Sequence, residues 1–597
     1  MKFNITLILI LVTVITAYSQ VKNIYSISFD NVAHHEASIK AKFSNLQPGN
    51  VTLKMAKKSP GSFGFYQFSQ NIYNFRITDE SGKELKFTQP KLGEWLVEKH
   101  KGQINISYKL FGDTRDGVFS HFSEDQVILN NPSAFIYVPK LASRPVKLKF
   151  NSRDDLKWKI ATQLKDSGEN IYEAENLNAF MDSPIFAGNF NVVQKTLDSG
   201  GKQFELKIAI IGSEGYATEL LNKVTEAIKE QYKVFGSYPD FSNGTYLYIL
   251  SFKGYNQNMA IEHKSSSILL NSNSVAELGT LKVLESMLSL FAKTYNKTRI
   301  RPVSLEPFNL QENVQTSEYW FSEGFSKYYG LLSMVRARII SEDKYLEKVS
   351  YILNDVIKST ALKYNNTLEM SKKSAYFASN LENNTALNAH NLYIPYEDHG
   401  FVIALLLDLK LRDKENLSLD DFISLIWTKY GKTNKGYTNE NIYATLREYA
   451  GDFFASDFYK DYIIKNTEFD FQKILESMGI NISFIELPYL GAEIAFNDKD
   501  LAEIVSYTIP GTPAYESGLE KGDIIISLDN KPFSNLTQFK NALNQNKIGK
   551  KVSIKYSRNG VEKDVSVKLA ANPNTILTPE LKISSKVEEK KRGWIGQ

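Results

Sequence analysis

Residues 22 to about 165 alternate apolar and polar side chains with the two-residue period of half-buried strands. The segments with this pattern, which are rich in β-branched and aromatic residues, are Ile24–Phe29, Ala37–Phe43, Val51–Met55, Phe75–Thr78, Ile104–Leu110 and Val146–Phe150. Turn-forming groups such as Pro48-Gly49-Asn50 separate them. The pattern therefore predicts an antiparallel β domain over residues 20–165.

From about residue 204 the apolar positions follow the three-and-four spacing of amphipathic helices. The predicted helices are Tyr216–Phe235, Leu278–Asn296, Ser317–Ser341, Glu342–Tyr364, His399–Leu411, Leu419–Tyr430 and Glu440–Ala450. Two strands, Phe204–Ile211 and Gly244–Leu250, are expected beside them. We therefore predict a mainly α-helical domain over residues 166–485.

The helix predicted at Leu278–Asn296 has two distinct faces. Its apolar stripe consists of Leu281, Leu284, Leu288, Phe291 and Tyr295, and we expect these side chains to be buried. The neighbouring stripe carries Glu285, Ser289 and Lys293, which would face a cleft.

Residues 486–572 form a separate unit that resembles a bacterial PDZ domain. Residues 513–525 give a turn, a short helix, a Gly-Asp corner and an apolar strand. The loop that would hold a peptide's terminal carboxylate consists of Leu490, Gly491, Ala492 and Glu493. Such a domain could bind peptides or protein C-termini as an added strand, or it could serve only for packing. The remaining residues, 573–597, form a polar tail, for which we expect a solvated helix or a disordered end.

Composition places the chain among ordinary multidomain globular proteins. Its 597 residues are 42% apolar and 23% charged, with a formal charge of +4. This balance gives no reason to expect a nucleic-acid partner. The chain has no cysteine, so neither a disulfide nor a lipoprotein attachment site is possible.

The amino terminus has the features of a bacterial signal peptide. Lys2 is followed by the apolar run Ile5–Ala17 and then by small residues up to Ser19. The apolar run is too short to span a bilayer, which argues against an anchor. We therefore expect cleavage near Ser19, release to the periplasm or beyond, and no stable membrane insertion.

Two motifs in the helical region resemble those of the PDZ-containing glycyl aminopeptidases, a family of gluzincin metallopeptidases. They are Arg299-Ile300-Arg301-Pro302 and Trp320-Phe321-Ser322-Glu323-Gly324. The resemblance implies a zinc-binding helix with His-Glu-x-x-His just before the first motif, and a third zinc ligand from the Glu of the second motif. In this chain residues 289–293 stand in that place, and both histidines and the catalytic glutamate are missing. Ser289, Leu290 and Lys293 take their positions.

These replacements remove the chemistry that zinc catalysis needs. Two histidines four residues apart on a helix can reach one ion, and the intervening glutamate acts as a base toward the zinc-bound water. Leu290 cannot accept a proton, and Lys293 brings a positive charge to a cation site. We therefore expect that the zinc typical of the family is lost, and that Glu323 is a vestigial ligand.

Glu323 needs a positively charged partner if it lies in a closed cleft. We expect an ion pair with Lys293, because both positions would point at one ion in the family; exposure to solvent is the alternative. The resemblance also implies substrate-binding roles for Glu262 and His263, which match part of the family's edge strand. Tyr396 could occupy the place of a tyrosine that steadies the tetrahedral intermediate.

The sequence thus predicts a multidomain α+β protein, with an N-terminal antiparallel β domain, a gluzincin-like peptidase domain and a C-terminal PDZ domain. We expect an exported, catalytically inactive zinc-aminopeptidase homologue that binds peptides or envelope proteins. Two alternatives stay open. One is an active metallo-aminopeptidase with an unusual metal site, so whether the chain is an enzyme is undecided. The other is a structural interaction module without ligand-binding clefts.

Overall fold

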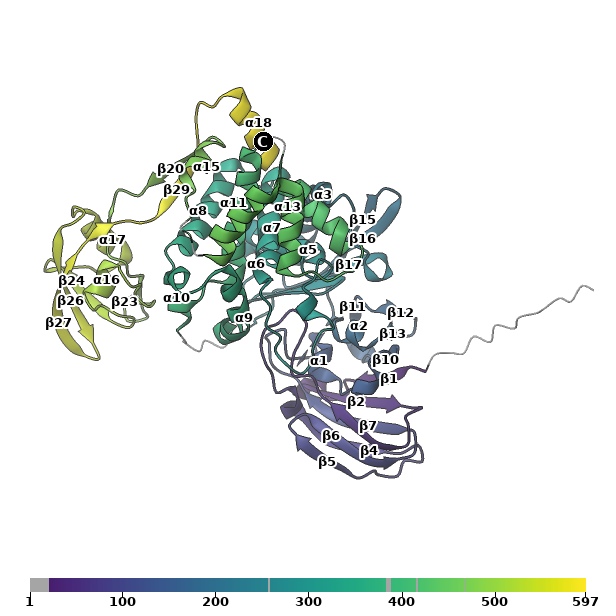
Figure 1. Cartoon of the computed structure of the whole chain (residues 1–597). Coiled ribbons are helices and arrows are strands. Elements are labelled where there is room, and N and C mark those ends of the chain that lie inside the picture. The colour runs from purple at the N-terminus through teal and green to yellow at the C-terminus, as the bar shows by residue number, and fades with distance from the viewer. Residues whose placement is uncertain are drawn as a thin grey trace, which may run out of the picture.

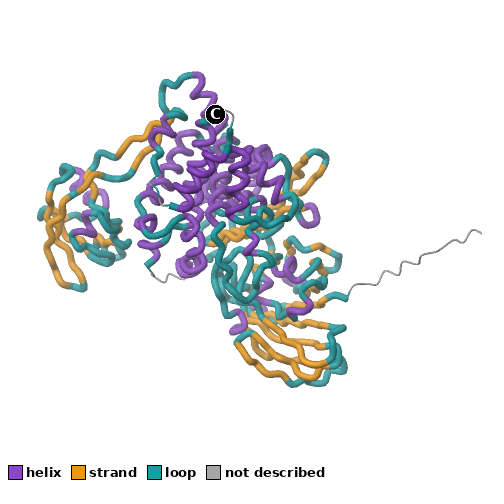
Figure 2. The backbone as a smooth tube through the Cα atoms, in the orientation of Figure 1, coloured by secondary structure: helices purple, strands orange, loops and turns teal. Residues whose placement is uncertain are grey.

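A computed structural model describes residues 21–596, apart from 256–257, 383–387, 415–416, 466 and 468. The predicted signal peptide therefore lies outside the described residues. Three regions follow one another along the chain: a β domain, a helical domain and a small β-rich domain (Figures 1 and 2). No helix in the described ranges has the length and apolar character needed to cross a membrane.

The N-terminal domain is built from three sheets around one core. The largest sheet runs β12 (Lys165–Asp166), β13 (Ile171–Ala174), β10 (Val146–Asn151), β1 (Asn23–Ser28), β2 (Glu36–Phe43), β7 (Ile104–Phe111) and β4 (Ile72–Thr78). A three-stranded sheet has the order β3 (Gly49–Lys54), β6 (Glu94–His100) and β5 (Phe87–Lys91). A four-stranded sheet has the order β11 (Lys159–Thr162), β14 (Ile185–Gly188), β9 (Gln126–Leu129) and β8 (His121–Phe122). Two short helices, α1 (Asn131–Ala134) and α2 (Leu177–Met181), pack with them.

This domain continues past residue 165, where the sequence suggested its end. Strand β13 pairs with β10, and β14 pairs with β9, so both belong to the N-terminal sheets. The sequence pattern missed them because four-residue strands are too short to show a clear period.

A mixed five-stranded sheet supports the helical domain. Its order is β15 (Asn191–Ser199), β16 (Lys202–Ile211), β17 (Thr245–Ser251), β19 (Ser266–Leu270) and β18 (Met259–Glu262). The helices are α3 (Ala217–Phe235), α4 (Val275–Leu278), α5 (Thr280–Tyr295), α6 (Tyr319–Ser322), α7 (Gly324–Arg336), α8 (Glu342–Ile357), α9 (Thr367–Glu382), α10 (Ala389–Leu392), α11 (Tyr396–Asp413), α12 (Leu419–Ile426), α13 (Asn439–Ala450), α14 (Asp452–Phe458) and α15 (Gln472–Glu476).

Helix α5 matches the predicted pattern with three differences. It begins at Thr280, because Gly279 has φ +80 and ends α4. Leu284 and Leu288 are fully buried in the core, as predicted, but Leu281, near the start of the helix, is only half-buried. Glu285 was expected on the cleft side, but its carboxylate pairs with Lys348 of α8 at 2.7 Å.

The third domain is inserted between two strands that pair with each other. The chain leaves the helical domain through β20 (Ile480–Phe484) and returns through β29 (Thr575–Pro579). Between them lie β21 (Pro488–Tyr489), β22 (Ile494–Phe496), β23 (Ala502–Ile504), α16 (Pro513–Glu516), β24 (Ile524–Leu528), β25 (Lys531–Pro532), α17 (Leu536–Asn544), β26 (Lys551–Arg558), β27 (Val561–Lys568) and β28 (Ala570–Ala571).

The tail was expected to be a solvated helix or a disordered end, and the structure shows a helix that is mostly exposed but buried at its C-terminal end. After β29 the chain forms helix α18 (Ser585–Ile595), which packs on the helical domain (Figure 1). The Trp594 side chain is fully buried, and its Nε1 donates to Tyr328 Oη at 2.8 Å. Arg336 donates to the Trp594 carbonyl at 2.7 Å. The sequence pattern was misleading because only one end of this helix is apolar.

Candidate functional site

Helices α5, α7 and α11 meet at the place where the sequence motifs converge. A Cβ on Gly324 would lie 2.2 Å from the backbone of Gly400, and one on Gly330 would lie 2.9 Å from that of Ser289. Glycine at these crossings therefore lets α7 approach both α11 and α5 closely. Asn296, just after α5, donates to the Phe321 carbonyl at 2.8 Å and ties that end of α5 to α6. The helix packing thus fixes the backbone around the site.

Two lysines and three glutamates form a charge cluster at this meeting point. Lys293 Nζ lies 2.9 Å from Glu323 Oε2, 2.9 Å from Glu397 Oε1 and 3.6 Å from Glu262 Oε2. Lys297 forms ion pairs with Glu262 and with Glu323. The ion pair predicted between Lys293 and Glu323 is therefore present, within a larger network of five charged groups, which we call the charge cluster.

The charge cluster is largely shielded from water. Glu323 is 0% exposed, Glu262 4%, Lys293 6% and Lys297 7%, whereas the Glu397 side chain at the edge of the cluster is 33% exposed. Burial raises the pKa of Glu397, but the nearby Lys293 ammonium outweighs it and holds this pKa at about 2. Burial lowers the pKa of Lys293, yet Glu323, Glu397 and Glu262 together raise it well above its usual range. Glu397 and Lys293 are thus held in their charged forms at neutral pH.

Three aromatic rings cover the charge cluster. The Phe63 ring centroid lies 5.0 Å from that of Tyr319 and 5.2 Å from that of Tyr396, and Lys297 Nζ lies 5.7 Å from the Phe63 centroid. Phe63 comes from a loop of the N-terminal domain. This loop approaches β18 closely, since a Cβ on Gly61 would lie 2.9 Å from the Glu262 carbonyl oxygen. The N-terminal domain therefore helps to exclude water from the cluster.

The residues at this centre do not fit a zinc ion. Ser289 is half-buried against α7, and Leu290 is buried and apolar. Both lysine ammoniums lie between the carboxylates that could have bound a cation, and like charges repel. Among the described residues, no group of three His, Cys, Asp or Glu side chains is arranged to hold a metal ion. No catalytic step through zinc can be assigned to these side chains.

The other residues implied by the family resemblance lie in different surroundings. Glu262 belongs to the charge cluster, and Tyr396 lies over it. His263 instead donates from Nδ1 to Asp182 Oδ1, 3.1 Å away in the N-terminal domain. Lys297 and Glu397 were not predicted as partners. Lys297 lies two residues past the end of α5, so helical spacing gave no signal for it.

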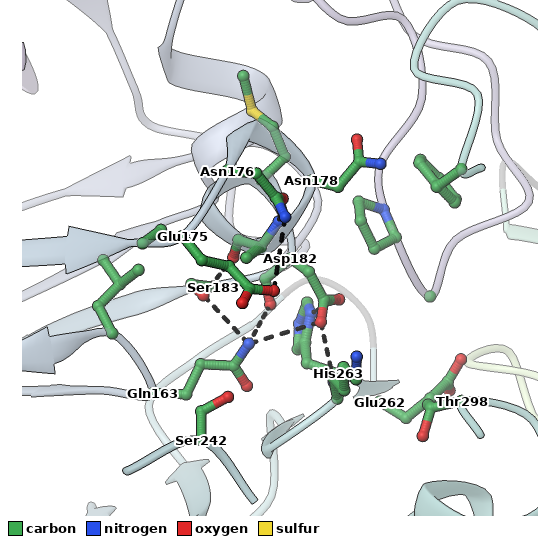
Figure 3. Close-up of a pocket in the computed structure, with 18 of the residues that line it drawn as sticks. Gln163, Glu175, Asn176, Asn178, Asp182, Ser183, Ser242, Glu262, His263 and Thr298 are labelled. Atoms are coloured by element: carbon green, nitrogen blue, oxygen red, sulfur yellow. Dashed lines mark hydrogen bonds and ion pairs between the residues drawn. The ribbon is translucent and has the colours of Figure 1, made fainter. Parts of the chain in front are cut away.

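A cavity of about 910 Å³ opens beside the charge cluster, at the seam between the N-terminal and helical domains. Figure 3 shows polar side chains along its wall, among them Gln163, Asp182, Ser242 and His263. Gln163 and Asp182 are tied to residues 263–266 of the helical domain by hydrogen bonds. This network fixes the two domains against each other and gives the cavity a polar wall.

The predicted carboxylate loop connects β21 and β22. Leu490 is buried, and its carbonyl accepts a hydrogen bond from Ala514 N at 2.8 Å. Gly491 has φ +81 and lies against Thr512. Within the described ranges, the N–H groups of Gly491, Ala492 and Glu493 donate to no partner. Strand β22 is also at the edge of its sheet, so its outer side can pair with an added strand.

Three family models match the chain. The one described as the Peptidase M61 N-terminal domain matches residues 24–189, and the one described as M61 glycyl aminopeptidase matches residues 289–403. A PDZ domain model matches residues 488–569.

One solved structure resembles the chain over nearly its whole length. The crystal structure of an aminopeptidase N family protein from Idiomarina loihiensis has a TM-score of 0.84, at 20% identity, over 96% of this chain and 100% of that one. This confirms the predicted multidomain α+β fold.

Two curated relatives match short stretches of the chain. A probable periplasmic serine endoprotease DegP-like from Marinomonas sp. (strain MWYL1) is 30% identical over 98 residues. A probable serine protease do-like from Buchnera aphidicola subsp. Acyrthosiphon pisum (strain APS) is 32% identical over 94 residues. These matches cover 16% and 14% of this chain, and 20% and 19% of the relatives. The chain therefore spans about a fifth of the length of these relatives.

Proposed function

Since this chain belongs to the M61 glycyl aminopeptidase family and carries a PDZ domain, we propose that it is an exported peptidase homologue that has lost zinc catalysis and binds peptides. One observation carries the proposal: Lys293 and Lys297 put their ammonium groups among the three carboxylates of the centre. A bound zinc ion would have to displace both ammoniums and would find no imidazole ligand.

Peptide binding is proposed for the PDZ domain. The free edge of β22 and the unpartnered N–H groups of residues 491–493 support it, because a peptide C-terminus needs both a strand partner and donors for its carboxylate. Export is supported by the apolar segment Ile5–Ala17 behind Lys2, and by the relative described as periplasmic. The expected partners are peptides or the C-termini of envelope proteins.

Metal analysis of the purified mature protein, combined with an aminopeptidase assay, tests the loss of catalysis. We expect far less than one zinc per chain and no hydrolysis of aminoacyl substrates after zinc is supplied. One zinc per chain that a chelator removes together with activity would overturn the proposal and favour an enzyme with an unusual metal site.

Restoring the motif provides a matched comparison. The triple variant Ser289→His, Leu290→Glu, Lys293→His recreates two ligands and a base, but it leaves Lys297 paired with Glu323. We therefore expect weak zinc binding by the triple variant, and tighter binding when Lys297→Ala is added, measured by calorimetry. Equal affinity of the two variants would mean that Lys297 does not block the ion. Titration with a C-terminal peptide library separates a peptide binder from a purely structural module.

A further inference from the structure

The outer face of the largest N-terminal sheet carries a concentration of lysines. Strands β10, β1, β2 and β7 alternate strictly between buried and accessible residues. Tyr25, Ile39 and Leu148 point inward and are 0–1% exposed. The outward positions of these four strands include Lys40, Lys42, Lys109, Lys147 and Lys149. We call this surface the lysine face.

Strand register brings these lysines into one plane. Ile24 of β1 lies between Lys42 of β2 and Lys147 of β10. Two residues further along, Ser26 lies between Lys40 and Lys149. Adjacent strands are about 4.8 Å apart, so the lysines on either side of β1 start about 10 Å from each other. Four ammonium groups therefore project from a small, nearly flat area.

Two carboxylates lie among these lysines, and each is paired at the margin of the face. Glu36 pairs with Lys109 at 2.7 Å, and Glu173, the cross-strand neighbour of Lys147, pairs with Lys22 at 2.7 Å. Lys149 donates to the carbonyl of Glu169, and neither Lys40, Lys42 nor Lys147 forms an ion pair with any described residue. The residues between the lysines are short or apolar: Ser26, Ser28, Ser38, Ser107 and Ile24. They leave the ammonium groups free to contact a partner.

We propose that the lysine face docks on a membrane surface that contains anionic phospholipids. Lysines near such a surface are attracted by its negative potential, and each adds to the affinity. Four lysines on a nearly flat sheet match the plane of a bilayer surface better than a nucleic-acid duplex. A duplex is a rod and would need a concave groove. Single-stranded nucleic acid is disfavoured because the middle of the face has no aromatic side chain for base stacking. Phe111 and Tyr73 lie only at its margin.

The position of the face is compatible with the other proposed activity. The N-terminal domain lies at one end of the molecule, and the PDZ domain lies to the other side of the helical layer (Figure 1). The lysine face is a surface distinct from both the charge cluster and the PDZ loop.

Sedimentation of the mature full-length protein with lipid vesicles tests the proposal. We expect binding to phosphatidylcholine vesicles that contain phosphatidylglycerol, little binding to pure phosphatidylcholine, and weaker binding as salt increases. The variant Lys40→Glu, Lys42→Glu should bind the anionic vesicles at least about tenfold more weakly. The variant Lys40→Gln, Lys42→Gln should show a smaller loss in the same direction. Unchanged circular dichroism would show that each variant is folded.

The PDZ domain offers a matched control. Lys551 and Lys568 are exposed cross-strand neighbours on β26 and β27, so Lys551→Glu, Lys568→Glu makes the same charge change on another sheet. This control should bind vesicles as the unmodified protein does. If the control pair lost as much vesicle binding as Lys40→Glu, Lys42→Glu, the effect would come from net charge alone, and the proposal would be overturned. No preference for anionic vesicles, or tight binding only to nucleic acid or to an acidic protein, would also overturn it.

Discussion

Lys293 and Lys297 supply two positive charges at a centre where the zinc motif would hold one divalent cation. The total charge is equal, but the chemistry differs. An ammonium group has no open coordination position and cannot lower the pKa of a bound water as zinc does. The same carboxylates, Glu323 and Glu262, are thus neutralised while the means of catalysis is absent.

Replacing Lys293 by methionine should destabilise the helical domain. Glu323, which is fully buried, would keep only Lys297, and the partly exposed Glu397 would lose its closest cation. Removing one partner of a buried pair costs about 3–5 kcal/mol, and we expect a loss in this range from chemical unfolding. Lys223→Met is the control, because Lys223 pairs with Glu219 on an exposed helix surface and should cost about 0.5 kcal/mol or less. A similar small loss for Lys293→Met would mean that water reaches the cluster.

The charge cluster should also shape the pH dependence of stability. The pKa of Glu397 falls from 4.5 to about 2 on folding, so its contribution is present above pH 4.5 and is lost as pH falls toward 2. The pKa of Lys293 is raised, so its contribution is present below its unfolded value of 10.5 and is lost as pH rises beyond it. Thermal unfolding of Glu397→Gln should show a shallower decline on the acid side. An identical acid profile would contradict this role of Glu397.

The sequence predicted one contact of this centre and missed the rest for a physical reason. The spacing of two motifs placed Lys293 opposite Glu323, since both stand at positions of one metal site. Lys297 follows the end of α5, where helical spacing no longer applies, and Glu397 enters from α11. Contacts between residues of separate elements depend on tertiary packing. The spacing of apolar residues along the sequence carries no information about such contacts.

At the level of elements, close glycine contacts decide how the helices around the site pack. The Gly324–Gly400 contact allows α7 and α11 to cross with their backbones nearly touching. The motif Trp-Phe-Ser-Glu-Gly was noted for its glutamate, yet its glycine has this separate packing role. Local patterns predicted the helices themselves, but not which residues meet at their crossings.

Gly400→Ala should separate α11 from α6 and α7. The added Cβ would lie 2.1 Å from the Trp320 carbonyl oxygen and 2.8 Å from Gly324 Cα, so the backbones must move. Overpacking of this kind costs about 1–3 kcal/mol, which a shift of the thermal midpoint would report. Gly215→Ala is the control, because its Cβ would meet nothing within 4 Å and should change stability by about 0.5 kcal/mol or less. Comparable shifts for both would contradict the proposed contact.

At the level of the whole molecule, the PDZ domain is inserted into the peptidase-like part. The sequence predicted its fold correctly from a turn, a helix and a Gly-Asp corner. The sequence did not predict that the chain returns to the helical domain after the PDZ domain. Strand β29 and helix α18 find their apolar surroundings only on helices that are distant in the sequence. Leu577, Trp594 and Ile595 all belong to the core of the helical domain.

Trp594→Ala should weaken the packing of α18 on the helical domain without unfolding the PDZ domain. Truncation of a fully buried tryptophan costs about 3–5 kcal/mol, and the hydrogen bond to Tyr328 is lost as well. We expect faster proteolysis and hydrogen exchange in α18, with unchanged exchange in β26 and β27. Leu581→Ala, at a side chain that is 99% exposed, should change neither. Unaltered exchange in α18 of Trp594→Ala would show that other contacts hold this helix.

The pairing of β20 with β29 decides how the PDZ domain can be removed in the laboratory. Ending the chain before residue 486 would delete α18 too, and would leave a tryptophan-sized void beside Tyr328 and Tyr345. Phe484 and Thr575 are direct cross-strand partners, so a short turn between them would close the ribbon as a hairpin. Excision with such a splice keeps both strands and α18, whereas simple truncation would confuse loss of the PDZ domain with damage to the body that carries it.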